Sequence, residues 1–284
     1  MAEKVKESGT LRFLYNTFIG RIVLRLLISR WVSKLCGAFL SSRLSKPLIK
    51  KFVKKNNIDL SQFESDNFKC FNDCFCRKLK PGFRDIPADE NVLFAPCDGL
   101  LSAYKIEADT VLPVKQSEYT LKSLLCDEFL AKKYENGVCL VFRLCVNHYH
   151  RYCYPVSGAK GENVFIKGKL HTVRPIALES KPVFAENCRE FTVIETEHFG
   201  SVLQMEVGAM LVGKIHNLHG AGSVTRGAEK GMFLYGGSTV ILLLEKDKAQ
   251  LDPAFFEATL RGLETPIQMG HPLATATTKP IATV

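Results

Sequence analysis

The sequence predicts an α+β protein, in which a helical, basic N-terminal arm precedes a β-rich body of sandwich or barrel type. Up to about residue 84, long apolar stretches carry scattered lysines and arginines. From residue 85 onward, short apolar runs alternate with Gly, Pro, Asn and Asp, a pattern typical of β-strands and their turns. We therefore expect two regions, a helical one over residues 1–84 and a β-rich one over residues 85–284.

The charge of the chain is concentrated in the arm. Residues 1–60 hold thirteen Lys or Arg and three acidic residues, a balance of +10, whereas residues 61–284 hold 25 basic and 26 acidic residues. A basic segment suits an anionic partner, which is either an acidic membrane surface or a nucleic acid. Nucleic acid is not favoured, because the arm has no recognised binding motif and its aromatic residues lie among aliphatic ones.

Residues 11–40 are apolar and aromatic, and their longest uncharged run falls short of the roughly 18 residues that a spanning helix requires. Two alternatives remain open for this segment. It is either an interfacial helix, or a helix pair divided at Gly20, lying on a membrane with snorkelling arginines. Or it is an ordinary helix that packs on the body. Residues 45–57 predict a further short, basic helix.

The body begins after Pro81 and Pro87. Residues 120–136 predict one helix, and the chain after Glu245 is expected to be mostly irregular. Seven apolar runs predict strands, namely residues 92–96, 99–106, 138–146, 163–168, 190–197, 201–215 and 238–246.

The ten cysteines are scattered through a long chain without an apolar leader, which indicates unpaired thiols in a reducing compartment. Cys70, Cys74 and Cys76 lack the second spaced pair of a zinc site. His148, His150 and Cys153 are also not favoured as ligands. We expect no metal.

Residues 234–245, LYGGSTVILLLE, place a Gly-Gly-Ser-Thr corner directly before the most apolar strand. By itself the corner is a common turn. It can also carry chemistry, because Gly237 tolerates backbone shapes that other residues resist and the Ser238 hydroxyl can attack the carbonyl before it. That attack requires a base. Asp98, in FAPCDGLLSAY, and His150, in FRLCVNHYHRYCYPVSG, follow strand-like runs and are candidates, although each also suits a structural role.

The order of these segments resembles the phosphatidylserine decarboxylase family from about residue 10 to residue 270. The resemblance rests on APCDG, FRLCVNHYHRYCYPVSG, GKLHTVRPIAL, KPVFAENCRE, VGAMLVGKI and KGMFLYGGSTVILLLEK. It implies that Asp98 orients His150, that His150 deprotonates Ser238, and that the chain cuts itself between Gly237 and Ser238. It also implies that Ser238 becomes a covalent pyruvoyl group, the cofactor of the reaction.

The resemblance further implies conversion of phosphatidylserine to phosphatidylethanolamine and CO2 through a Schiff base, by large and small chains that stay folded together. The expected location is peripheral, on the cytoplasmic side of a membrane. Two alternatives remain, an uncut lipid-binding protein and a pyruvoyl enzyme for another serine lipid or a soluble amino acid.

One position departs from the family pattern. Many members carry a second histidine three residues after the first, and here that residue is Cys153. Either His150 serves twice, as base and as acid, or a helper takes part, with His171 as the best candidate and Cys153 as another. Lys115 and Tyr119 are expected to build the cleft.

Overall fold

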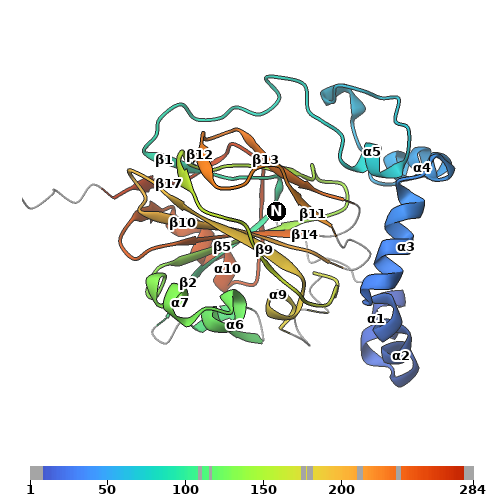
Figure 1. Ribbon diagram of the computed structural model, residues 1–284, viewed down its shortest axis with the longest axis horizontal. Helices are drawn as coiled ribbons and strands as arrows, with labels where there is room; N and C mark the ends of the chain where they lie inside the picture. The colour runs from blue at the N-terminus through green and yellow to red at the C-terminus, as the bar shows by residue number, and fades with distance from the viewer. Residues whose placement is uncertain are drawn as a thin grey trace, which may run out of the picture.

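The computed structural model describes residues 9–107, 111–114, 117–173, 177, 182–209, 214–234 and 238–277. A helical arm stands beside a body built around antiparallel sheets (Figure 1). The predicted α+β class is confirmed.

The arm is a chain of short helices. They are α1 (Gly9–Asn16), α2 (Phe18–Leu27), α3 (Arg30–Leu40), α4 (Pro47–Lys55) and α5 (Phe71–Phe75), with 3-10 turns η1 (Arg43–Ser45) and η2 (Leu60–Gln62). The basic helix predicted at residues 45–57 is confirmed as α4. In the described residues, no helix combines the length and the apolar character that a membrane span requires.

The predicted division of the arm at Gly20 is wrong. The helices separate at Thr17 and Ser29, whose side chains accept hydrogen bonds from Gly20 N at 3.0 Å and Val32 N at 3.4 Å and so begin the next helix. Gly20 lies inside α2, where a Cβ would meet Phe13 O at 2.0 Å. Glycine is needed there because α1 and α2 approach closely.

Within the part of the chain that the structure describes, the body contains one large sheet and three small ones, and every strand pair is antiparallel. In the described residues the large sheet has the order β12-β7-β9-β10-β14-β5-β2-β16, with β8 also on β9. Its strands are β2 (Gly99–Lys105), β5 (Val138–Leu144), β7 (Gly158–Lys160), β8 (Val164–Ile166), β9 (Arg189–Glu195), β10 (Ser201–Val207), β12 (Gly222–Val224), β14 (Ser238–Leu244) and β16 (Thr265–Ile267).

The small sheets have the orders β1-β17-β15, β11-β13-β6 and β3-β4. Their strands are β1 (Val92–Phe94), β3 (Val111–Val114), β4 (Ser117–Thr120), β6 (Arg151–Cys153), β11 (Ile215–Asn217), β13 (Glu229–Phe233), β15 (Ala249–Leu251) and β17 (Pro272–Ala276). All seven runs predicted as strands contain strands in the structure.

The core lies on both faces of the large sheet, and β14 shows this best because all seven of its residues are buried. Val240 packs in one cluster with Tyr152 and Phe233 of the small sheet β11-β13-β6, so these two sheets face each other as in a sandwich. Ile241 packs on the opposite face, where helices and the arm residue Leu24 cover the sheet. Burial on both sides explains why this strand reads as a continuous apolar run.

The single helix predicted over residues 120–136 is wrong. The chain forms α6 (Leu121–Leu125) and α7 (Glu128–Lys133), separated by Cys126 in the left-handed region with φ 54°. The Asp127 side chain accepts a hydrogen bond from Leu130 N at 2.9 Å and begins the second helix.

The expectation of an irregular tail is also wrong. After β14 the chain forms β15, α10 (Pro253–Leu260), β16 and β17. Asp252 caps α10 by accepting from Ala254 N at 2.9 Å, and Pro253 occupies the first turn. Asp-Pro before an apolar run is the signal that predicts this helix. Elsewhere, α9 (Val183–Glu186) adds one short helical turn.

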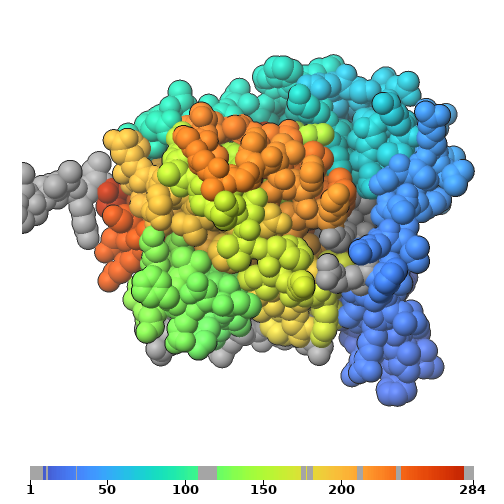
Figure 2. Space-filling view, viewed as in Figure 1, coloured from blue at the N-terminus to red at the C-terminus, as the bar shows by residue number. Residues whose placement is uncertain are grey.

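The arm is docked along one side of the body, and its α1–α2 end projects beyond it (Figure 2). Leu14, Leu24 and Ile28 are buried in the cluster on the helical face of the large sheet. Near α4 and α5, Leu40 and Ile49 pack with Phe75 and with residues of the body. The arm is therefore attached at both ends.

Candidate active site

The sheet brings two of the proposed site residues to one end of adjacent strands. Strand β2 pairs with β5 with Leu100 opposite Arg143, and Asp98 directly precedes this strand. On the other side of β5, Ser238 begins β14 opposite Leu144. Neighbouring strands lie about 4.8 Å apart, so the backbones of Asp98 and Ser238 are on the order of 10 Å apart, with the end of β5 between them.

His150 follows that end of β5 by six residues. Its ring is completely buried and lies against Phe75 of α5, with ring centroids 3.9 Å apart and an angle of 35° between the planes. The His150 carbonyl accepts from Phe233 N at 2.9 Å, which joins it to β13. The histidine is therefore fixed on one side by the arm region and on the other by the body.

The protonation of His150 follows from its contacts. Its Nδ1 lies 2.9 Å from the His148 carbonyl oxygen, which can only accept, so Nδ1 carries the proton. Burial lowers the pKa of His150 well below its usual value, and the positive charge of Arg77 lowers it further. The imidazole is thus neutral, with an unprotonated Nε2. Within the described residues, this Nε2 has no hydrogen-bond partner.

The Ser238 hydroxyl is in a similar position. Ser238 is completely buried, and its Oγ has no partner among the residues that the structure describes. A buried polar atom without a partner is costly, and a catalytic role is one of the explanations for it. Gly237, on the other side of the proposed cleavage site, lies outside the described residues, as does Lys115.

Asp98 is held by Arg84 rather than by a histidine. Arg84 donates from Nε to Oδ1 at 3.0 Å and from Nη2 to Oδ2 at 2.6 Å, and Met269 N also donates to Oδ1 at 2.9 Å. Within the described residues, Asp98 makes no hydrogen bond to His150. Its charge does reach the loop that carries His150, because it opposes the lowering of the His148 pKa by burial.

The two possible helpers are engaged elsewhere. The Cys153 thiol donates to Pro96 O at 3.4 Å, and burial raises its pKa to about 12. This cysteine therefore stays protonated near neutral pH. His171 lies close to Tyr15 OH through Nδ1 at 3.3 Å and to the Glu186 carboxylate through Nε2 at 3.4 Å. It connects the arm to the body.

Sequence reasoning missed Phe75, Arg77 and Arg84, which the structure places against His150, its loop and Asp98. All three fall in residues 68–84, a stretch of aromatic, cysteine and basic residues assigned to the arm. The available signal was an arginine directly after FNDCFC, since a charge beside an apolar helix requires a buried partner.

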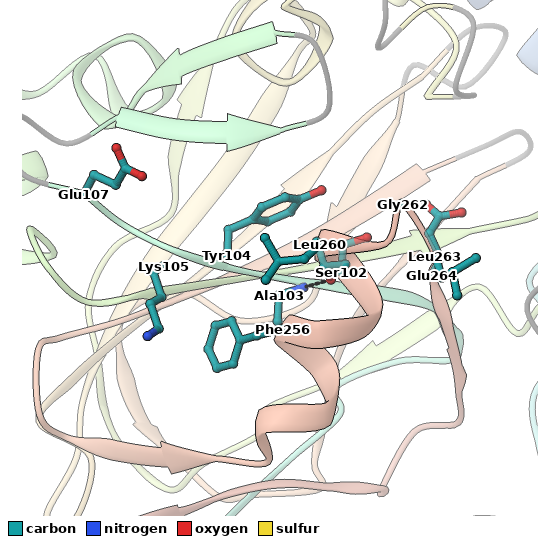
Figure 3. A pocket seen from close by; sticks show the side chains of 11 residues that line it. Ser102, Ala103, Tyr104, Lys105, Glu107, Phe256, Leu260, Gly262, Leu263 and Glu264 are labelled. Carbon is teal, nitrogen blue, oxygen red and sulfur yellow. Dashed lines mark hydrogen bonds between the residues drawn. The ribbon is translucent and has the colours of Figure 1, made fainter.

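The described residues contain no cluster of three or more His, Cys, Asp or Glu that could hold a metal ion. All ten cysteines are free. A groove of about 520 Å³ lies between β2 and α10, where Figure 3 shows Tyr104, Lys105, Phe256 and Leu260. None of Asp98, His150 and Ser238 lines it.

Ser238 starts a central strand with a buried hydroxyl that has no partner among the described residues, and His150 is a buried, neutral histidine in the loop that follows the neighbouring strand. A serine and a neutral histidine are residue types that can supply a nucleophile and a base. Comparisons with known proteins show the family of the chain. A family model described as phosphatidylserine decarboxylase matches residues 71–274. The chain belongs to the phosphatidylserine decarboxylase family.

Relatives match over almost their whole length. The chain is 42% identical over 270 residues to phosphatidylserine decarboxylase proenzyme 2 of Clostridium acetobutylicum, covering 95% of this chain and 92% of the relative. It is 40% identical over 277 residues to the phosphatidylserine decarboxylase proenzyme of Clostridium botulinum strain 657, covering 95% and 94%. The Ruminiclostridium cellulolyticum proenzyme is 40% identical over 275 residues, covering 95% and 92%.

Proposed function

We propose that this protein decarboxylates phosphatidylserine to phosphatidylethanolamine and CO2, after cutting its own chain between Gly237 and Ser238. Family membership supports the reaction. The observation that carries the site is the pair of buried, unpartnered atoms, Ser238 Oγ and His150 Nε2, near one end of the central strands.

Self-cleavage begins when His150 Nε2 takes the proton of the Ser238 hydroxyl. The oxygen attacks the Gly237 carbonyl carbon, the Gly237–Ser238 C–N bond breaks, and the nitrogen receives the proton, which leaves an ester. Removal of the Ser238 Cα proton then breaks the Cβ–O bond and releases a Gly237 carboxylate and dehydroalanine. Addition of water and loss of ammonia convert dehydroalanine to the pyruvoyl ketone.

Asp98 is the third residue of the proposal. The Arg84 guanidinium binds both oxygens of the Asp98 carboxylate. These bonds hold the carboxylate in one position. We assign it the task of stabilising the imidazolium that forms when His150 accepts the proton.

The residues fit a pyruvoyl group at position 238, since β14 is hydrogen-bonded on both sides and would hold the new N-terminus in place after cleavage. The pyruvoyl ketone supplies an electron sink for the carbon that loses CO2. His150 is the proposed donor of the proton to that carbon, because the thiol of Cys153 is a poor acid at its pKa of about 12.

The arm supports a peripheral position on an acidic membrane surface. Arg21 and Arg25 project among exposed apolar residues of α2, which include Phe18 and Ile22. Such a surface suits the boundary between head groups and acyl chains, where phosphatidylserine lies. The free cysteines support the cytoplasmic side, where thiols stay reduced.

Intact mass tests the proposal. We expect chains of 237 and 47 residues in place of one 31.8 kDa chain, with a carbonyl group on the smaller piece. Asp98→Ala, His150→Ala and Ser238→Ala should stay uncut, and Cys153→Ala should be cut. A folded, uncut wild-type protein without carbonyl reactivity would favour the lipid-binding alternative.

A further inference from the structure

Arg77 lies directly beyond α5, in the region that the sequence assigned to the arm. Its side chain is 3% exposed, and its guanidinium lies over the ring of Phe63 at 4.6 Å. A buried arginine remains charged, so its contacts must justify its desolvation.

Those contacts are made with the loop that carries His150. Arg77 Nη2 donates to Asn147 O at 2.9 Å and to His148 O at 3.1 Å, and Nη1 donates to Cys74 O at 3.4 Å. One guanidinium therefore ties the end of α5 to two successive carbonyls of the body.

The His148 carbonyl is the important one, because His150 Nδ1 donates to the same oxygen at 2.9 Å. This carbonyl receives two donors and fixes both the ring orientation and the tautomer of His150. Since Asp98 is held by Arg84 and, among the described residues, does not bond to His150, one task that a carboxylate usually has beside a catalytic histidine, orienting the ring, falls here to a carbonyl held by Arg77.

The positive charge of Arg77 also helps to keep the His150 imidazole neutral. After burial, the groups that lower the pKa of His150 are Arg77 and then His148, and the hydrogen bond to the His148 carbonyl opposes them. Phe75 covers the ring and brings no charge. Arg77 therefore disfavours the imidazolium before the reaction begins.

We propose that Arg77 is a positioning residue for self-cleavage: it holds the His148 carbonyl, which keeps His150 in the Nδ1–H tautomer and leaves Nε2 available to Ser238. The inference rests on the proposed role of His150. It also makes the region before residue 85 part of the reaction machinery.

The test uses two variants of the full-length protein. Arg77→Lys keeps the positive charge but loses the guanidinium that donates to several carbonyls, and Arg77→Met loses both the charge and the donors. Arg151→Met is the matched control, because Arg151 also neighbours His150 and donates to Cys76 O at 2.8 Å and to Glu229 at 2.6 Å. It does not bond to the His148 carbonyl. Processing is followed by gel after synthesis in a cell-free system.

We expect both Arg77 variants to cut about 10- to 100-fold more slowly than wild type, the range that a small misplacement of a reacting group produces. Arg151→Met should cut at close to the wild-type rate. Normal cutting by folded Arg77→Lys overturns the proposal. If Arg77→Met does not fold, the Arg77→Lys rate decides.

A second readout is independent of cutting. In the Ser238→Ala background, imidazole ¹⁵N NMR reports the tautomer of His150, assigned by comparison with His150→Gln. In the Ser238→Ala protein, and in the same protein with Arg151→Met, we expect only the Nδ1–H tautomer of His150. With Arg77→Met added instead, we expect a mixture of the two tautomers. An unchanged tautomer in Arg77→Met overturns the inference, whereas normal cutting by His150→Gln refutes the proposed role of His150 instead.

Discussion

The arm and the body differ in the exposure of their apolar side chains. In the described residues, eleven of the seventeen large exposed hydrophobic side chains lie between Phe13 and Leu48, including Phe18 at 79%, Trp31 at 76% and Leu35 at 69%. In the body, all seven residues of β14 are buried. The surface of a soluble protein rarely concentrates apolar side chains in this way. We therefore expect a membrane or a partner to cover the exposed side of the arm.

The contrast also limits what the arm can be. Residues such as Leu24 and Ile28 pack on the body, so one side of the arm is an ordinary packing surface. The other side presents aromatic and aliphatic groups among Arg12, Arg21 and Lys34. The packing alternative left open by the sequence is therefore confirmed for one side of these helices, and the membrane-lying alternative stays a prediction for the other side.

The largest effect on stability is expected from a substitution at the junction between the arm and the body. Phe75→Ala removes a fully buried ring that packs with Leu40 of the arm and against His150. We expect a loss of about 3–5 kcal/mol in the free energy of unfolding, measured with urea. Phe129→Ala, on a ring that is 87% exposed, is the control and should stay within about 0.5 kcal/mol of wild type. A similar small loss for Phe75→Ala would mean that the arm is not anchored there.

A pH series tests the buried histidine of the body. Burial lowers the pKa of His150, so below its ordinary pKa the unfolded chain binds a proton that the folded chain does not. Stability is fully present above the unfolded-state pKa of about 6.5 and falls as the pH is lowered, by at most about 1.4 kcal/mol per pH unit for this proton. His148 acts in the same direction. His150→Gln should show a smaller loss between pH 7.5 and pH 5, and an equal loss would contradict the burial of a neutral His150.

The exposed side of the arm should matter for membranes and not for folding. Trp31→Ser with Leu35→Ser removes two neighbouring apolar groups of α3, and we expect about tenfold weaker binding to vesicles that contain phosphatidylserine, with little change in stability. Phe129→Ser is the matched control on the body. If the control weakens binding as much as the double variant, the membrane contact is not specific to the arm.

A rise in salt concentration should produce the smallest of these changes, a partial loss of vesicle binding. Raising the salt from 0.1 M to 1 M shortens the Debye length from about 10 Å to about 3 Å and screens the basic residues of the arm, but leaves apolar insertion intact. Vesicle co-sedimentation should therefore weaken severalfold without disappearing. Complete release at 1 M salt would show that the apolar side chains do not insert.

The sequence by itself determined the features that depend on local pattern. The strand-like runs, the basic helix at residues 45–57, the charge of the arm and the order of family segments were all readable, because strand period, turn residues and motif spacing are properties of adjacent residues. Local pattern failed at Cys126, where a left-handed residue divides a helical run, and in the tail, where the Asp252-Pro253 cap was overlooked.

The tertiary structure decided what depends on contacts between distant residues. The register of β2, β5 and β14 puts Asp98 and Ser238 at the same end of the sheet, although 140 positions separate them. Arg77 meets the His148 carbonyl across 71 positions. A sequence can show that an arginine or a carbonyl is present, but only packing specifies which acceptor a buried donor finds, because that partner is set by the whole fold and not by its neighbours in the chain.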